Sequence, residues 1–246
     1  MIAGQAKYMS TGRITGVSLG PGDPDLITVK GLQVLKEADK IYFPGSQFSD
    51  GRKDSYALSI LQHYDLDPAK WEGFYLSMSL GRKEARSLYE KIFLNIKQDY
   101  EKGLGIAIVS EGDASTYSSF SYLLAHLQDA NLPVSVIPGI TSYALAAAIH
   151  ANPLCIQGEK MVILPRVKCV AELQQSLKHF DTVVLMKIRS VMPVILEALE
   201  STSVTVFYGE RLGTEKQFIS MDIAEIRERE IPYFALLIIK TIPEAI

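Results

Sequence analysis

The chain has 246 residues, of which 48% are hydrophobic and 22% charged, and its formal net charge is −3. This length and composition predict a globular protein of one large or two modest domains, without the basic excess of nucleic-acid-binding proteins. The sequence shows no apolar run long enough to span a bilayer and no apolar segment of the signal-peptide kind. We therefore expect a cytoplasmic protein with no nucleic-acid or membrane partner.

The first half of the chain alternates short β-rich runs with helical patterns, which is typical of a parallel α/β sheet. Thr28 is a suitable N-cap for the first helix, and Gly103 is expected to end the longest one. Pro44 and Gly45 are expected to stop the second strand. The predicted strands are residues 13–20, 40–45, 71–79, 105–113 and 134–139, and the predicted helices are 29–38, 55–64, 84–103, 118–130 and 141–151.

The pattern changes after Asn152 and Pro153. Later strand-like runs follow one another with little helix between the last of them, which predicts a mixed sheet with antiparallel pairs. We therefore expect two α/β domains, residues 1–154 and 155–246, with a cleft between them. The predicted strands of the second domain are residues 160–165, 182–188, 203–209 and 234–240, and its predicted helices are 170–180 and 191–200. Residues 217–226 lie close to the last strand with little helix between.

Three loops that contain glycine follow predicted strands in the first domain: LGPGDPD, SEGDASTY and PGITSY. Ligands of open α/β sheets bind beyond the carboxyl ends of the strands, so we expect the three loops to share one rim. Gly16, Gly20 and Gly22 have neither dinucleotide-motif nor P-loop spacing, and the first loop holds aspartates but no lysine. Such a loop suits a ligand without phosphate, and S-adenosylmethionine (SAM) is one. Alternatively, Asp23 and Asp25 organise the turn and the helix start that follows.

The three loops also carry a resemblance to a known family. The segments GVSLGPGDPDLITVKG, VSEGDASTYSSF and VIPGITSYALAAAIHANPL resemble, in order, three motifs of the tetrapyrrole methylases, which are SAM-dependent enzymes of cobalamin and sirohaem synthesis. The resemblance continues through VVLMKI, GERLGT and FALLIIK and covers nearly the whole chain. The runs YSSFSYL, ADKIYFPGS and LMK resemble the branch that methylates C-20 of precorrin-2 or its cobalt form. Ala114 stands where the family has proline, and we expect a less rigid loop there.

The resemblance implies where the cofactor and the substrate bind. SAM is expected to lie folded in the cleft between the two domains. The implied cofactor contacts are Pro21, Glu111, Gly112, Asp113, Thr116, Thr141 and Ser142 from the first domain, and Met186, Gly213, Ala235 and Leu236 from the second. The predicted catalytic groups near the transfer point are Tyr117, Glu111 and Lys187, although Tyr117 also suits a core-edge aromatic and Lys187 a solvated strand end.

The implied substrate carries many carboxylates, which favours arginine and lysine in its binding surface. We predict that Arg82 and Arg86 bind substrate carboxylates and that Asp23 also contacts substrate, although runs such as GRKEAR are also typical of a solvated helix face. Members of the family are commonly homodimers, so a homodimer is expected. Two cysteines without a C-x-x-C motif predict buried free thiols, and the spacing of the four histidines predicts no metal site.

Other functions remain open at this point. Another tetrapyrrole methylase, acting at C-11, C-17 or C-2/C-7, would share the three motifs. The segment ITVKGLQVLKEADKIY also resembles diphthine synthase, which methylates a modified histidine on a translation factor. A protein of another class, which binds SAM or carries a macrocycle without catalysis, differs from all of these by showing no turnover.

Overall fold

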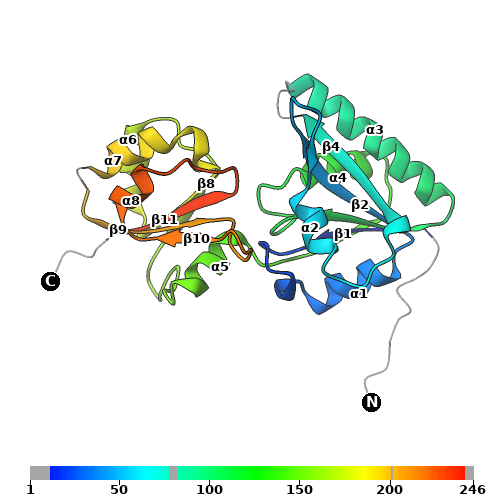
Figure 1. The fold of residues 1–246 in the computed structure, drawn as a ribbon, viewed down its shortest axis with the longest axis horizontal. Helices are drawn as coiled ribbons and strands as arrows, with labels where there is room; N and C mark the ends of the chain where they lie inside the picture. Colours follow the sequence, from blue (N-terminus) through cyan, green and yellow to red (C-terminus); the bar gives the residue numbers. More distant parts are fainter. Residues whose placement is uncertain (1–11, 78–81, 201, 242–246) are drawn as a thin grey trace, which may run out of the picture. The chain divides into compact units, whose positions relative to one another are not determined.

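The computed structural model describes residues 12–77, 82–200 and 202–241, and the side chains of residues 82–85 also lie outside the description. The chain forms two compact units that divide between Thr141 and Ser142 (Figure 1). Helix α5 (Ser142–Ile149) falls between this division and the boundary expected at residue 154. It packs its buried Ala146 against Phe207 and Leu236 of the second sheet, so its packing places it with the second unit.

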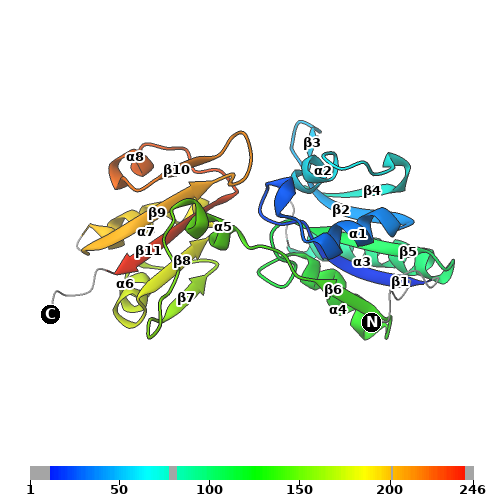
Figure 2. The ribbon, with the colours of Figure 1, turned by 90° about the horizontal axis from the view of Figure 1, so that it is seen from below.

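The first unit is built on a sheet in the order β3-β2-β5-β1-β6, with β4 on β2 (Figure 2). All of its pairs are parallel except the short β2–β3 pair. The strands are β1 (Arg13–Ser18), β2 (Lys40–Gln47), β3 (Lys53–Asp54), β4 (Trp71–Ser77), β5 (Gly105–Ser110) and β6 (Val134–Ile137), and the helices are α1 (Val29–Glu37), α2 (Tyr56–Leu61), α3 (Arg82–Glu101) and α4 (Phe120–Asp129).

Both faces of this sheet are covered, because successive side chains of a strand point to opposite faces. In β5, Ile106 and Ile108 pack with α3 and α4, whereas Ala107 and Val109 pack with α1 and α2. The N-cap of α1 is Thr28, whose hydroxyl accepts the backbone N–H of Gly31 at 3.0 Å, as its sequence position predicted.

The prediction that β2 stops at Pro44 and Gly45 is wrong, because the strand continues to Gln47. Only residues 40–42 of β2 pair with β5, and only Ser46 and Gln47 pair with β3. Pro44 therefore lies where β2 has a ladder partner on the β4 side alone, so proline's missing N–H breaks no hydrogen bond on the other side.

The second unit is a mixed sheet in the order β10-β9-β11-β8-β7 (Figure 2). Strand β11 is antiparallel to both neighbours, which confirms the antiparallel pairing expected from the sequence. The strands are β7 (Met161–Leu164), β8 (Thr182–Met186), β9 (Val204–Glu210), β10 (Phe218–Ser220) and β11 (Ala235–Thr241), and the remaining helices are α6 (Val170–His179), α7 (Met192–Leu199) and α8 (Ile223–Arg227).

This second sheet is also covered on both faces, with α5 on one and α6, α7 and α8 on the other (Figure 1). The cysteines do not both lie in the core as expected: Cys155 is half-buried, and Cys169 is exposed because it immediately precedes α6 at the surface. No helix in the described part of the chain has the length and apolarity needed to cross a membrane.

Candidate cofactor and active site

The three glycine-containing loops share one rim, as predicted. Strand β1 lies between β5 and β6 and is parallel to both, so the loops after all three strands leave the same edge of the sheet. The first two loops also pair directly. The N–H of Gly112 donates to the carbonyl oxygen of Gly20 at 2.7 Å. In return, the N–H of Gly20 donates to the carbonyl oxygen of Gly112 at 3.1 Å. Both glycines have positive φ, of 83° and 63°, which other residues rarely adopt.

Gly139 brings the third loop against the other two. A Cβ added at Gly139 would lie 2.5 Å from the Cβ of Ser18 and 2.7 Å from the carbonyl oxygen of Gly112. Such distances are well inside van der Waals contact, so only glycine lets the three backbones approach this closely.

Ser18, the last residue of β1, ties all three loops together and was missed from the sequence. Its fully buried hydroxyl donates to the carbonyl oxygen of Ile137 at 2.7 Å and accepts the N–H of Ala114 at 2.9 Å. A proline at position 114 would have no N–H to donate. The expected loss of rigidity at Ala114 is therefore countered by a hydrogen bond that a proline at this position could not make.

Asp113 is a second tie between the loops. One carboxylate oxygen accepts the N–H of Gly139 at 2.8 Å. The other accepts the N–H of Ser115 at 2.9 Å, the hydroxyl of Ser115, and the hydroxyl of Thr116 at 3.3 Å. Burial alone would raise the pKa of Asp113, but these donors outweigh it and hold that pKa below its ordinary value. The carboxylate therefore organises the rim, and its predicted contact with the cofactor ammonium stays a prediction.

Glu111 is a half-buried titratable group of the rim, and no cation is among the groups that shift its pKa. Burial raises the pKa of its carboxyl group, and the backbone amides of Glu111 itself and of Ala57 lower it only in part by hydrogen bonding. Ala57 is the second residue of α2, so the carboxylate lies at the positive end of this short helix. A carboxyl group whose pKa is raised by burial is a candidate for proton exchange in catalysis.

Tyr117 ends the second loop in a left-handed backbone conformation, with φ of 52° and 44% of its surface exposed. This exposure fits both a ligand contact and a place at the edge of the core, so the role of Tyr117 stays a prediction. The N–H of Thr116 donates to the carbonyl oxygen of Asp113 at 3.1 Å. Thr141 and Ser142 are half-buried and lie where the third loop leads into α5.

Two tyrosine hydroxyls hold the acidic first loop in place. One tyrosine is in α2, and the other lies in the turn that follows α2. The hydroxyl of Tyr56 donates to the carbonyl oxygen of Pro21 at 3.3 Å, and that of Tyr64 donates to the carbonyl oxygen of Pro24. Asp23 accepts the N–H of Asp25 at 2.9 Å and so caps the single 3-10 turn Pro24–Leu26. The turn-organising interpretation of Asp23 therefore has direct structural support, and Asp25 is exposed.

The cofactor residues predicted in the second unit come together at one edge of its sheet. Met186 ends β8 and lies opposite Leu236 in the register, and Ala235 starts β11 opposite Glu210 at the end of β9. Gly213 follows β9 in the same turn, and its N–H donates to the side chain of Gln217 at 2.8 Å. The side chains of Met186 and Leu236 share the face of the sheet that α5 covers.

Glu210 carries a charge network beside this edge. Its side chain is 2% exposed, and it accepts the guanidinium of Arg229 at 2.8 Å and the hydroxyl of Tyr208. The guanidinium also stacks on the ring of Phe218 at 3.5 Å. Burial and the bond to Glu210 raise the pKa of Tyr208. The network fixes the end of β9, from which the turn to Gly213 starts.

The predicted substrate arginines lie on α3, which follows β4 and so begins at the carboxyl edge of the first sheet. Arg86 is exposed there. The side chain of Arg82 lies outside the described residues. Strand β4 pairs with β2 on the side away from β5 and β1, so β2 separates the start of α3 from the loop after β5, and β2 and β5 separate it from the loop after β1.

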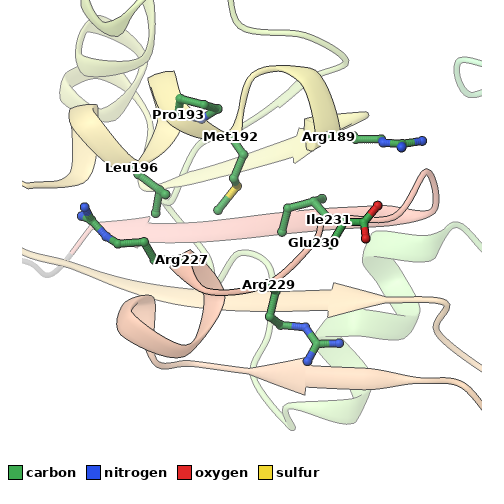
Figure 3. A pocket seen from close by; sticks show the side chains of 8 residues that line it. All are labelled: Arg189, Met192, Pro193, Leu196, Arg227, Arg229, Glu230 and Ile231. Atoms are coloured by element: carbon green, nitrogen blue, oxygen red, sulfur yellow. The ribbon is translucent and has the colours of Figure 1, made fainter.

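A cavity of about 310 Å³ lies elsewhere, between α7 and the segment after α8 (Figure 3). Its floor is apolar, and Arg189 and Arg227 point away from one another at its two ends (Figure 3). Arg227 is paired with Glu200 at 3.1 Å and Arg229 with Glu210 at 2.8 Å. The arginines do not converge on one ligand, and none of the residues predicted from the sequence lines this cavity.

Comparison with known proteins decides the family. The model of the tetrapyrrole (corrin/porphyrin) methylases matches residues 13–226. The chain belongs to this family. It is 27% identical to the cobalt-precorrin-2 C(20)-methyltransferase of Salmonella typhimurium, over 93% of this chain and 96% of that protein. It is 31% identical to a precorrin-2 C(20)-methyltransferase of Sinorhizobium, over 94% and 96%.

Solved structures show the same fold in this tetrapyrrole methylase and its relatives. The uroporphyrin-III C-methyltransferase of Thermus thermophilus, complexed with S-adenyl homocysteine, superposes with a TM-score of 0.63 at 22% identity, over 93% of this chain and 97% of that one. Within residues 12–77, 82–200 and 202–241, no three or more His, Cys, Asp or Glu side chains are grouped to hold a metal ion.

Proposed function

We propose that this tetrapyrrole methylase transfers a methyl group from SAM to C-20 of precorrin-2 or of its cobalt form in cobalamin biosynthesis. The observation that carries the proposal is the rim of three tied loops in a chain of this family. The position C-20 is supported by two relatives with that activity in their names, which align with 93% and 94% of the chain.

The residues of the rim fit SAM. Residues 19–23, 111–117 and 138–141 include no lysine or arginine, so they offer backbone groups and carboxylates and no cation for a phosphate. We infer that Pro21, Glu111, Gly112, Asp113, Thr116, Thr141 and Ser142 contact the amino-acid and ribose parts, and that Met186, Gly213, Ala235 and Leu236 contact the adenine. When bound, SAM supplies an electrophilic methyl group on a positively charged sulfur.

The chain's own task is to position the acceptor carbon and to exclude water. Alignment of two reactants in a fixed geometry lowers the barrier by several kcal/mol, of order 7–11 in favourable cases. The ties of Ser18 and Asp113 hold the rim rigid for this purpose. Tyr117, exposed at the end of the second loop, is proposed to orient the macrocycle.

A proton must leave C-20 when the new carbon–carbon bond forms, since the carbon returns to its unsaturated state. We propose Glu111 as the group that accepts it. Glu111 is half-buried, desolvation raises the pKa of its carboxyl group, and backbone amides donate hydrogen bonds that hold the carboxylate in place. A raised pKa and a fixed position are properties expected of a general base.

Two further parts of the proposal concern partners. Arg82 and Arg86, at the start of α3, and Asp23 are proposed to contact substrate, and Arg86 is exposed as that role requires. The protein is proposed to act as a homodimer, which light scattering of the purified protein would test.

The decisive experiment is mass spectrometry of the product after incubation with SAM and precorrin-2, with and without cobalt. We expect the macrocycle to gain one methyl group, located at C-20 by NMR, and the preferred substrate form identifies the route. SAM binding is measured separately by calorimetry. Binding of SAM without any methyl gain would overturn the C-20 assignment and leave the cofactor assignment in place.

A further inference from the structure

Two cations directly follow the ends of β8 and β9 in the second unit. Lys187 follows Met186, and Arg211 follows Glu210. Both strands are antiparallel to β11, so their ends lie at the same edge of the sheet. One strand separates them, which places the two backbones roughly 10 Å apart at the usual strand spacing.

Both cations have a backbone conformation that a side chain disfavours. The φ angles are 55° at Lys187 and 47° at Arg211, in the left-handed region. A residue with a Cβ is strained in this conformation, whereas glycine adopts it freely. Strained residues of this kind are concentrated at ligand-binding sites, because the surrounding structure holds them in a useful position.

The ion pair that Arg211 makes with Glu210 is a long one. The guanidinium of Arg211 is 3.9 Å from Glu210, but the same carboxylate oxygen accepts Arg229 at 2.8 Å. Glu210 is thus already neutralised by a closer partner, and the Arg211 side chain is 44% exposed. Lys187 is exposed as well.

An aromatic pair separates the two cations at the start of β11. The rings of Tyr233 and Phe234 are 5.0 Å apart and nearly perpendicular, and the residues are 56% and 39% exposed. The N–H of Arg211 donates to the carbonyl oxygen of Phe234 at 2.9 Å, so the pair and the cation are fixed to one another. The edge therefore combines apolar surface with positive charge on either side.

We propose that Lys187 and Arg211 bind two peripheral carboxylates of the tetrapyrrole, with Tyr233 and Phe234 against its apolar body. The proposal deepens the proposed function and rests on it. A planar macrocycle with acidic side chains around its rim matches this arrangement, and arginine binds a carboxylate through two hydrogen bonds. Cofactor and substrate must meet for methyl transfer, and Met186 and Ala235, the predicted adenine contacts, are the neighbours of these residues.

The test uses Lys187→Gly and Arg211→Gly, because glycine removes the charge and the backbone strain together and so does not threaten folding. The control is Lys178→Ala, an exposed cation at the end of α6, which leads into the opposite edge of β8. Binding is measured by fluorescence quenching of uroporphyrin, a carboxylate-rich tetrapyrrole, and of its uncharged octamethyl ester. We expect each glycine variant to bind uroporphyrin about tenfold more weakly, with the ester and SAM unaffected.

In turnover assays Arg211→Gly should raise the KM for precorrin-2 about tenfold with little change in kcat, because the contact is made to a group remote from the reacting carbon. The proposal is overturned if uroporphyrin binds both glycine variants as well as it binds Lys178→Ala, or if SAM affinity falls equally. If the wild-type protein fails to methylate precorrin-2 while the glycine variants still bind uroporphyrin more weakly than wild type, the proposed function is wrong and the carboxylate site is retained.

Discussion

Replacing Asp113 by asparagine tests whether the three loops act as one body. The substitution keeps the shape of the side chain but exchanges an acceptor oxygen for an amide that only donates. In the wild-type protein one oxygen accepts Gly139 and the other accepts the backbone N–H of Ser115, at 2.8 and 2.9 Å. Whichever way the asparagine turns, its NH₂ group faces one of these N–H groups, which then loses its partner.

The expected cost follows from burial. Asp113 is 7% exposed, so water does not replace the lost acceptor. A hydrogen bond to a charged group contributes about 1.5–3 kcal/mol, and we expect Asp113→Asn to lower the free energy of unfolding of the first unit by about 2–3 kcal/mol. For a domain of this size the melting temperature should fall by roughly 6–12 °C.

The pH dependence gives an independent check. Because the folded-state pKa of Asp113 lies below the ordinary 3.8, its contribution to stability is present above that pH and is lost as pH falls through the lowered pKa. The difference in the free energy of unfolding between wild type and variant, measured in urea, should therefore be constant near neutral pH and become smaller below pH 3.8. Asp65→Asn, at an exposed loop position, is the control. A change within about 0.5 kcal/mol for Asp113→Asn would refute the reasoning.

Three further substitutions address the rim. Ser18→Ala should lower the free energy of unfolding by about 2 kcal/mol, measured by urea titration, because it leaves two buried backbone groups unpaired. The control is Ser49→Ala at an exposed position, and equal stability of the two variants would contradict this prediction. The Cβ introduced by Gly139→Ala would lie 2.5 Å from the Cβ of Ser18, so this variant should lose about 1–3 kcal/mol of unfolding free energy and bind SAM more weakly in calorimetry. An unchanged SAM affinity would show that the close approach of the loops is not needed for cofactor binding. Burial raises the pKa of Glu111 above 4.5, so kcat/KM should fall toward acid pH with a midpoint above that value. Glu111→Gln should be as stable as wild type but nearly inactive at every pH, and retained activity would exclude Glu111 as the base.

Much of the fold could be predicted because its signals are local. Alternating strand and helix patterns, the Thr28 cap and Gly103 located most elements of the described chain, since periodicity and capping depend on neighbouring residues. The end of β2 could not be predicted in this way. Pro44 is a strand breaker by its own chemistry, and it is tolerated only because β5 and β3 leave that position of β2 without a partner.

In the candidate site, too, local sequence signals predicted some features and not others. The three loops were visible as glycine-rich turns after strands, and the α/β rule predicted their shared rim. The roles of individual side chains were less accessible. Asp113 was expected to bind the cofactor, but its oxygens accept four donors from residues 115, 116 and 139. Ser18 was missed because nothing in a strand sequence marks a serine as a tie between loops.

By itself, the sequence determined the α/β class, the motifs of the tetrapyrrole methylases and the absence of a phosphate-binding loop, because each is written in neighbouring residues. Tertiary structure alone decided which groups meet. The bonds of Ser18 join residues 96 and 119 positions apart along the chain, and they exist because β1 lies between β5 and β6. Lys187 and Arg211 likewise lie at the same edge of the sheet only because β11, a later strand, is inserted between β8 and β9. Strand order is set by the packing of the whole sheet, so no local pattern specifies it.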